Sequence, residues 1–254
     1  MTADQTMPSA GDALFDVPTP IEEMLRLAVD FTRHNDALDI ALRAKNSTPD
    51  TAHSSSARDL AADVLKVLRA IHNQRLHPSE DLTRAHLRLR QLAFLAEASA
   101  DHPPGAAREL TALATKTVMD NALIVAEQTL NAQSKTLHSE GSGLTAAHKS
   151  ALVEIARGHV VANSTLGREY TRSSGSKVPM STLRRLEAKH LVTRTSGTAL
   201  PAYYGGPLQD RVQLTPAGIT ALAAALTRPA AVRTAPRVAG VPLASPSQAT
   251  ARSR

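Results

Sequence analysis

Apolar residues recur at helical spacing in four stretches of the first half of the chain. The first stretch follows Thr19 and Pro20, a helix-capping residue and a proline that fits the first helical turn. The pattern predicts helices over residues 20–44, about 57–73, 79–99, and 106–132 or beyond. Apart from a Ser/Thr/Pro-rich loop over residues 46–56, only short breaks separate them. We therefore expect an antiparallel helical bundle.

The second half of the chain alternates between short helical and short extended patterns. Thr145 is suited to cap a helix that runs to about Ala156 and ends at Gly158. A second short helix is predicted within residues 179–192. The remaining elements are two short strands, over residues 191–195 and 211–214, and a final helix that begins at Thr215 and Pro216.

Residues 159–178 admit two interpretations. Ser164 is placed to cap a short helix over residues 165–170, although Gly167 inside it would cost about 1 kcal/mol relative to alanine. The alternative is a β-hairpin, with strands over residues 159–162 and 169–172 and a turn over 173–176. The pattern does not choose between them.

The helix within residues 179–192 has one apolar side and one polar, basic side. Leu183, Leu186 and Leu191 are spaced to share a buried side. Each residue turns the helix by about 100°, so the polar residues fall along an exposed stripe. They are Ser181, Thr182, Arg185 and Lys189. Hydroxyl groups and cations on such a face suit a duplex groove, where bases and phosphates both accept hydrogen bonds, although a solvated face has the same composition.

Charge is distributed unevenly along the chain. Residues 1–140 contain 14 Lys/Arg and 19 Asp/Glu, whereas residues 141–254 contain 15 Lys/Arg and only 4 Asp/Glu. Without residues 227–254, the second half still carries a net charge of +6. This asymmetry indicates that the second half is the part that meets a polyanion.

Two short motifs resemble a known family. Residues 183–192, LRRLEAKHLV, are followed after the predicted strands by residues 214–218, LTPAG. Together they resemble the winged-helix transcription regulators of the MarR and PadR type, in which a helix ends in L-x-x-L-x-x-x-G-L-V and a wing hairpin precedes L-T-x-x-G. The resemblance covers about residues 144–226. His190 stands where the family usually has glycine, and histidine tolerates the left-handed conformation better than most residues.

The resemblance implies a DNA-reading helix and a wing. Ser181, Thr182, Arg185 and Lys189 match its groove-facing positions, and Arg194 and Arg211 would flank the wing. The predicted DNA-binding residues are Lys177, Ser181, Thr182, Arg184, Arg185, Lys189, Arg194 and Arg211. Because such regulators read two half-sites by symmetry, we expect a homodimer. Its surface is predicted around Phe31, Leu38, Ile124 and Val125.

Motifs for other chemistry are absent from the sequence. There is no cysteine, no Gly-rich phosphate loop and no apolar run long enough to cross a membrane. The ten histidines are scattered, and those such as His34 and His148 are expected to be exposed or at helix ends. Residues 1–20 lack the pattern of a secretory signal. We expect a cytoplasmic protein that is not an enzyme, with no metal or other cofactor and no membrane contact.

The predicted fold class is mainly α, with an N-terminal antiparallel helical bundle followed by an α+β winged-helix domain. The predicted segments are a disordered N-terminus (1–17), a bundle for dimerisation or sensing (18–136), a linker (137–143), a winged-helix domain (144–226) and a disordered basic tail (227–254). The predicted function is a transcriptional regulator that binds double-stranded DNA. The alternative is a protein-interaction module that uses a winged-helix fold without binding nucleic acid.

Overall fold

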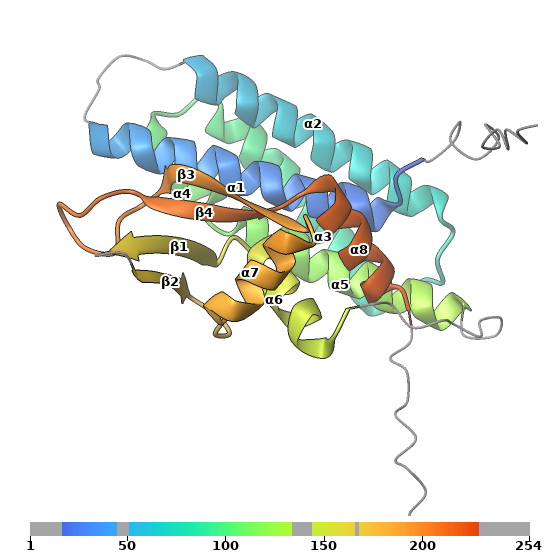
Figure 1. Cartoon of the computed structure of the whole chain (residues 1–254). Helices are drawn as coiled ribbons and strands as arrows, with labels where there is room; N and C mark the ends of the chain where they lie inside the picture. Colours follow the sequence, from blue (N-terminus) through green and yellow to red (C-terminus); the bar gives the residue numbers. More distant parts are fainter. Residues whose placement is uncertain (1–16, 45–50, 134–143, 166–167, 229–254) are drawn as a thin grey trace, which may run out of the picture.

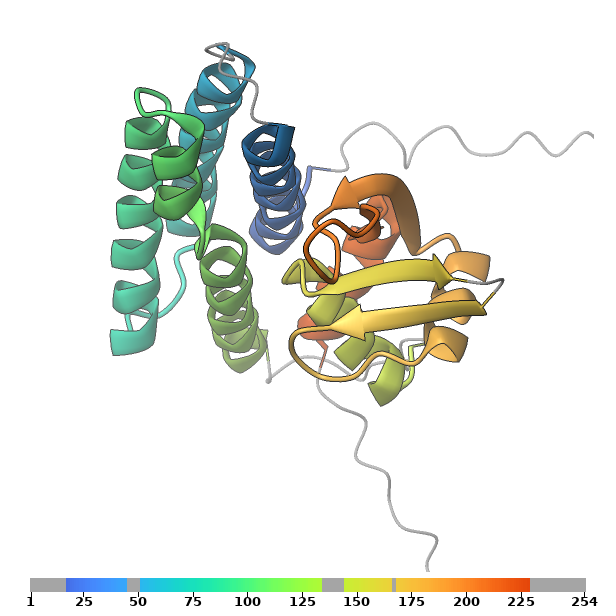
Figure 2. The same ribbon diagram turned by 90° about the vertical axis from the view of Figure 1, so that its left-hand side faces the viewer.

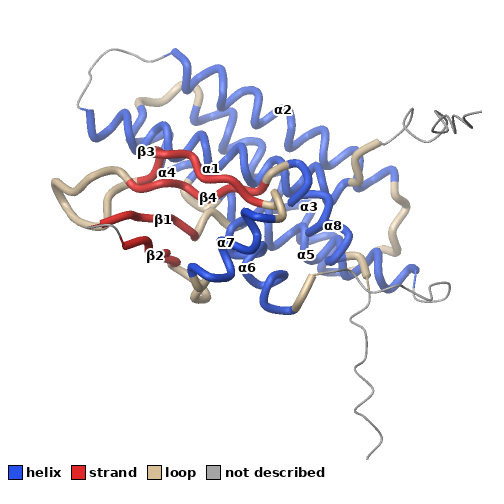
Figure 3. Tube along the Cα trace, viewed as in Figure 1, coloured by secondary structure: helices blue, strands red, loops and turns tan. Residues whose placement is uncertain are grey.

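The chain is mainly helical and carries one four-stranded antiparallel sheet (Figures 1 and 3). The computed structural model describes residues 17–44, 51–133, 144–165 and 168–228, so the predicted tails and linker lie almost wholly outside it. The helices are α1 (Pro20–Ala44), α2 (Thr51–Asn73), α3 (Glu80–Ser99), α4 (Pro104–Thr111), α5 (Ala114–Gln133), α6 (Ala146–Ala156), α7 (Met180–Ala188) and α8 (Pro216–Leu226). The strands are β1 (Val160–Thr165), β2 (Arg168–Ser173), β3 (Val192–Ala199) and β4 (Gln209–Leu214).

Helix α1 lies between the helical bundle and the sheet (Figure 2). Its start is fixed by a reciprocal cap, in which Thr19 N donates to Glu22 Oε2 at 2.9 Å and Glu22 N donates to Thr19 Oγ1 at 3.2 Å. One side of α1 packs on α2, α4 and α5, and the other side packs on α8, β3 and α6. The predicted bounds of this helix are confirmed, and its burial on both sides makes it the common core of the two halves.

Four long-range polar contacts leave α1 from one face. From Glu22, the other three α1 residues are 11, 14 and 21 positions away, or roughly three, four and six helical turns. The contacts are Thr220 Oγ1 to Glu22 Oε1 at 2.7 Å, Arg33 Nε to Gln213 Oε1 at 3.0 Å, Arg211 Nε to Asp36 Oδ2 at 2.8 Å, and Arg43 Nη2 to the Gly206 carbonyl at 2.8 Å. They hold α8, β4 and the β3–β4 loop against the bundle.

Two of the predicted helix boundaries in the bundle are wrong. Helix α2 begins at Thr51, inside the predicted loop, because Ser54 Oγ donates to the Ala100 carbonyl at 2.6 Å and Ser56 contacts His34. The helix predicted over residues 106–132 is two helices, with a break after Thr111. Thr111 bonds to Asn35 of α1, and this tertiary contact fixes the end of α4.

The strand order in the sheet is β2-β1-β4-β3. Strands β1 and β2 form an antiparallel hairpin that pairs Val160 with Ser173 and Thr165 with Arg168. Residues 159–178 therefore contain the β-hairpin, which was one of the two interpretations left open. Strand β4 pairs with β1 on one side and with β3 on the other, so the hairpin extends the sheet formed by β3 and β4.

The predicted helices of the second half are confirmed, with their caps. The Thr145 side chain accepts from His148 N at the start of α6, and the Thr215 side chain accepts from Gly218 N at the start of α8. A Cβ placed on Gly218 would lie 1.9 Å from the Leu191 carbonyl oxygen. The glycine of the LTPAG motif is therefore needed where α8 crosses the end of α7.

His190 adopts the left-handed conformation expected at this position, with φ of 55°. Replacing His190 with glycine should stabilise the chain by about 0.5–1 kcal/mol, since glycine adopts this conformation without a steric penalty. Urea unfolding of the two proteins measures the difference. Ala62→Gly, at an exposed position in the middle of α2, is the matched control and should destabilise by about 0.5–1 kcal/mol. A loss of stability in His190→Gly would show that the imidazole contributes more than the strain costs.

The dimer surface predicted on α1 and α5 is wrong. Phe31, Leu38 and Val125 are at most 1% exposed, because they pack in the core of a single chain, and Ile124 is half-buried. Any self-association must use another face. No helix in the described part of the chain is long and apolar enough to cross a membrane.

Candidate nucleic-acid interface

Helix α7 lies on the side of the molecule opposite α2 and α3 (Figure 2). It packs on α6, β2 and β3 through Leu183 and Leu186, which are fully buried. Ser181, Arg185 and Lys189 are exposed, as the helical spacing predicts. The helix is thus held by its apolar side and presents its basic side to solvent.

The loop before α7 is fastened by the buried carboxylate of Glu154 on α6. Glu154 Oε2 accepts from Ser176 N at 3.2 Å and contacts His159 Nδ1 at 3.0 Å, while Oε1 accepts from Arg157 Nη1 at 3.1 Å. Burial opposes ionisation of Glu154, but the hydrogen bonds from His159 and Arg157 outweigh it and lower the pKa of the carboxyl. A Cβ on Gly175 would lie 2.0 Å from Glu154 Oε2, so glycine permits this approach. The hydrogen bonds to Glu154 hold the loop that carries Lys177 and leads into the first turn of α7.

The four acidic residues of positions 141–254 are all engaged elsewhere. Glu154 binds the loop before α7, and Asp210 Oδ1 accepts from Gly197 N at 3.1 Å. Glu169 and Glu187 both bind Arg194. Lys177, Arg185 and Lys189 have no ion-pair partner among the described residues, and all three are exposed. Their charge is therefore available to an external anion.

No family model, curated protein or solved structure matches the chain. The site is thus interpreted from its own geometry.

That geometry divides the predicted DNA-binding residues into two groups. Lys177, Ser181, Arg185 and Lys189 are exposed around α7, and Thr182 is half-buried beside them. The remaining three arginines bind acidic side chains. Arg184 pairs with Glu169 at 3.1 Å, Arg194 pairs with Glu187 and Glu169, and Arg211 pairs with Asp36.

Arg211 and Arg194 have roles that their predicted place at the wing did not indicate. The Arg211 side chain is only 14% exposed, and its guanidinium donates to Asp36 and to the Gly158 carbonyl. Arg194 joins α7 to β2 through Glu187 and Glu169, so it orients the helix. Of the three paired arginines, only Arg184 keeps a side chain that is mostly exposed.

His148 was missed as part of this surface. It lies at a helix end, as expected, in the first turn of α6, but its side chain is buried. Burial lowers the pKa of His148, and the neighbouring charges of Lys189 and Arg185 lower it further. All three effects favour the neutral imidazole. The influence of the two α7 cations on α6 arises from the fold and has no signal in the local sequence.

The β3–β4 loop carries two exposed aromatic rings. Tyr203 is 67% exposed and has one side of its ring against Gly206 of the same loop, and Tyr204 is fully exposed. Arg43 of α1 holds the loop by its Gly206 carbonyl. This leaves both rings free to contact a ligand.

His34 on α1 is also buried, contrary to expectation. Burial lowers the pKa of His34 from 6.5 to about 4, and the charges of His53 and Arg108 act in the same direction. The unfolded chain therefore takes up a proton that the folded chain does not. We expect the free energy of unfolding to fall as the pH decreases from 6.5 to about 4. His34 contributes at most one proton to the difference in bound protons that sets the slope of this pH dependence.

Urea unfolding at a series of pH values measures this slope. His34→Gln removes the titrating group and should flatten the pH dependence over this range. The matched control is His77→Gln, at an exposed position, which should leave the slope unchanged. Equal slopes for the parent and His34→Gln would contradict the assignment.

Proposed function

We propose that this protein is a transcriptional regulator that binds double-stranded DNA through α7. The observation that carries the proposal is the exposed basic side of α7, with Arg185, Lys189 and nearby Lys177 unpaired among the described residues. A helix packed by its apolar side and carrying hydroxyl and cationic groups on the other fits the major groove, which is wide enough to admit it. A cytoplasmic location is part of this proposal.

The order of elements supports a winged-helix arrangement. Helix α6 precedes β1, α7 precedes β3, and the adjacent strands β3 and β4 form a hairpin followed by α8. The β1–β2 hairpin occupies the chain position of the helix that ordinarily precedes the recognition helix. Strand β2 then replaces that helix as the support of α7, through Glu169 and its bonds to Arg184 and Arg194.

The residues of the surface have separate roles in this proposal. Arg185 and Ser181 contact base edges, because they occupy the exposed stripe of α7. Lys177 and Lys189 contact phosphates on either side of the groove, and Tyr203 and Tyr204 contact the backbone beyond the wing. Arg194 and Arg211 bind no DNA but hold α7 and β4 in place.

The test is the salt dependence of DNA binding by the full chain. Fluorescence anisotropy with a labelled mixed-sequence duplex gives the affinity at several salt concentrations. Each phosphate contact contributes about −0.9 to the slope of log affinity against log salt, so the two phosphate contacts of Lys177 and Lys189 give a slope of roughly −2 per chain. Absence of binding at low salt would reject the proposal. The alternative of a protein-interaction module would then be favoured.

We also propose that two copies associate through α3. Leu87 and Phe94 lie seven residues apart on its outer side, 55% and 73% exposed, and Gln91 is exposed between them. Exposed large apolar side chains in one stripe indicate an interaction surface. In such a dimer the two α7 helices lie at opposite ends, because α7 is on the side of the molecule opposite α3 (Figure 2), so each α7 would bind a separate stretch of DNA.

The dimer is tested by light scattering after size-exclusion chromatography. The parent should have the mass of two chains, and the double variant Leu87→Ser and Phe94→Ser should have the mass of one. Leu113→Ser, at another exposed apolar position, is the matched control and should remain dimeric. A parent that stays monomeric at high concentration would contradict the prediction.

A further inference from the structure

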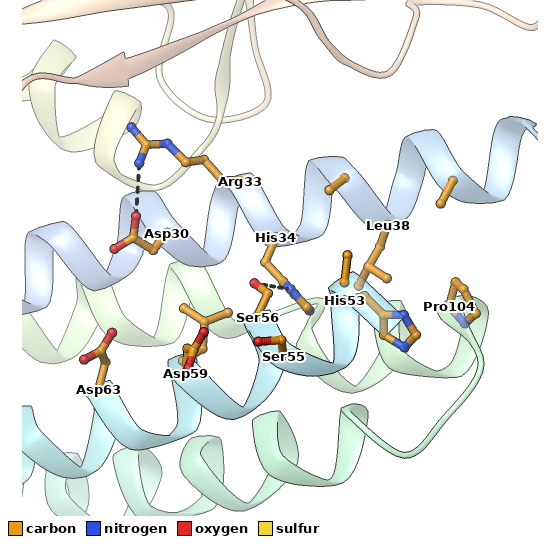
Figure 4. A pocket seen from close by; sticks show the side chains of 14 residues that line it. Asp30, Arg33, His34, Leu38, His53, Ser55, Ser56, Asp59, Asp63 and Pro104 are labelled. Carbon is orange, nitrogen blue, oxygen red and sulfur yellow. Dashed lines mark hydrogen bonds and ion pairs between the residues drawn. The ribbon is translucent and has the colours of Figure 1, made fainter. Parts of the chain in front are cut away.

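A cavity of about 670 Å³ lies between α1 and α2, on the bundle side of α1 (Figure 4). Its volume falls within the range of small-molecule sites in proteins. Pro104 at the start of α4 lies at one end of it. The cavity is remote from the exposed face of α7, so the proposed DNA contact does not account for it.

The two ends of the cavity differ in chemistry. Asp30 of α1 and Asp59 and Asp63 of α2 gather at one end, as Figure 4 shows. The opposite end is lined mainly by small apolar and aliphatic side chains, Ala37, Leu38, Ala41 and Pro104, and the His53 imidazole lies among them (Figure 4). A ligand that satisfies both ends must carry positive charge at one end of an apolar body.

The acidic end has more carboxylates than the surrounding protein neutralises. Arg33 Nη1 pairs with Asp30 Oδ1 at 3.2 Å, while its Nε donates to Gln213 on β4. Asp59 and Asp63 are exposed to solvent, one turn apart, and have no ion-pair partner in the part of the chain that the structure describes. Arg26 lies beside Asp30 and Asp63 in the adjoining hollow, where Lys66 pairs with Glu23. Three aspartates against two arginines still leave this end negative.

The wall of the cavity also contains a buried nitrogen atom that has no hydrogen-bond partner among the described residues. His34 is only 4% exposed and lines the cavity between its two ends (Figure 4). Its Nδ1 lies 3.0 Å from Ser56 Oγ, whereas its Nε2 has no hydrogen-bond partner among the described residues. A buried nitrogen without a partner costs free energy, and a ligand polar group in the cavity would remove that cost.

We propose that the cavity between α1 and α2 binds a small organic cation. The ammonium or amidinium group of this ligand pairs with Asp59, Asp63 and Asp30, and its apolar body packs on Leu38 and Pro104. The body of the ligand lies against His34 between the two ends. This site is independent of the proposed DNA binding, because it lies on the other side of α1 and is tested without DNA.

The test compares three probes of the same size and different charge. They are 4-phenylbutylamine, which is cationic at neutral pH, the neutral 4-phenylbutanol, and the anionic 4-phenylbutyrate. Isothermal titration calorimetry with the full chain at pH 7.5 should show saturable binding of the amine. Its affinity should exceed that of the alcohol by about tenfold, equivalent to about 1.4 kcal/mol, and the carboxylate should not bind.

Two variants separate the two ends of the site. Asp59→Asn with Asp63→Asn should weaken the amine about tenfold and leave the alcohol unchanged, and both positions are exposed, so folding should be unaffected. Asp81→Asn on α3, also exposed, is the matched control and should bind like the parent. Leu38→Met changes the apolar end and should alter the affinity of the amine and the alcohol alike.

Two outcomes would overturn the proposal. One is the absence of amine binding at millimolar concentration by the full chain. The other is equal amine affinity in the parent and the double Asp59→Asn and Asp63→Asn variant. The second outcome would place any observed binding elsewhere on the molecule.

Discussion

Replacing Asp36 with alanine should lower the free energy of unfolding by about 3–5 kcal/mol, because it leaves the guanidinium of Arg211 buried without its counter-charge. The two side chains are 6% and 14% exposed, and Arg211 Nη2 lies 2.6 Å from Asp36 Oδ1. Asp101→Ala is the matched control, since Asp101 pairs with Arg58 at the surface. Exposed pairs contribute about 0–1 kcal/mol, so this variant should be close to the parent.

The cost of breaking the Asp36–Arg211 pair should come mainly from leaving a buried charge unpaired, and less from losing the attraction between the two side chains. Burial raises the pKa of Asp36, and the hydrogen bond and charge of Arg211 offset this only in part. A buried pair of this kind can be replaced by apolar residues at little cost, whereas removal of one member is costly. The double variant Asp36→Leu and Arg211→Met should therefore lose less stability than Asp36→Ala.

The variant Arg211→Met tests in which direction the stability deficit changes with pH. Without Arg211, the pKa of Asp36 should rise further above its unfolded value, so the folded state favours the protonated carboxyl. The stability deficit relative to the parent should be smallest at low pH and grow as the pH rises through the folded pKa. Urea unfolding at several pH values measures it. A deficit that is independent of pH would contradict the assigned role of the pair.

Simultaneous replacement of Arg185 and Lys189 with alanine should weaken DNA binding roughly tenfold or more without unfolding the chain. If Arg185 contacts a guanine edge, its loss alone costs about 1–3 kcal/mol and relaxes preference at one base pair. If Lys189 contacts only phosphate, its loss weakens all sequences alike and reduces the salt slope by about one. Both side chains are exposed, and such substitutions usually change stability by less than about 0.5 kcal/mol.

Two further variants distinguish the loss of a DNA contact from a general loss of charge or of folding. Arg69→Ala with Arg75→Ala removes two exposed cations from α2 and the turn that follows it, far from α7, and should leave DNA affinity nearly unchanged. Leu186→Ala removes a buried side chain beneath Arg185 and should cost about 2–5 kcal/mol of stability. If the Arg185 and Lys189 double variant binds DNA as tightly as the parent, α7 is not the reading helix.

The elements that local patterns determine were predictable from the sequence. Helices α1, α6 and α8 have the expected caps, Thr19, Thr145 and Thr215, because a capping side chain and the amide it accepts from are neighbours in sequence. The buried and exposed sides of α7 follow from helical spacing in the same way. These features depend on residues within one or two turns.

Elements that depend on distant contacts were not predictable. Residues 51–56 are rich in Ser and Thr, which favours a loop, but Ser54 and Ser56 are held in helix α2 by Ala100 and His34. The break after Thr111 has no proline or glycine to mark it, and it follows a bond to Asn35. In both cases tertiary contacts override local preference.

The residues of the candidate sites also divide into those that local spacing predicted and those that depend on distant contacts. The exposed cations of α7 were predicted from their spacing, whereas the partners of Arg194 and Arg211 were not. Asp36 precedes Arg211 by 175 residues, so no local pattern connects them. The cavity was missed for the same reason, since its walls come from α1, α2 and α4, and a single histidine in a helix carries no sign of burial.

The contacts between α1 and the last elements constrain how the chain folds during its synthesis. They join residues that are 163–198 positions apart in the sequence. At about 5–20 residues per second, a ribosome needs roughly 10–40 s to make the intervening chain. The bundle is complete at Gln133, so it must wait for the 93 residues up to Leu226 with one side of α1 uncovered. Asp36 is without its arginine for 175 residues. Folding is therefore completed only when α8 emerges, and the nascent bundle is the species most prone to aggregate.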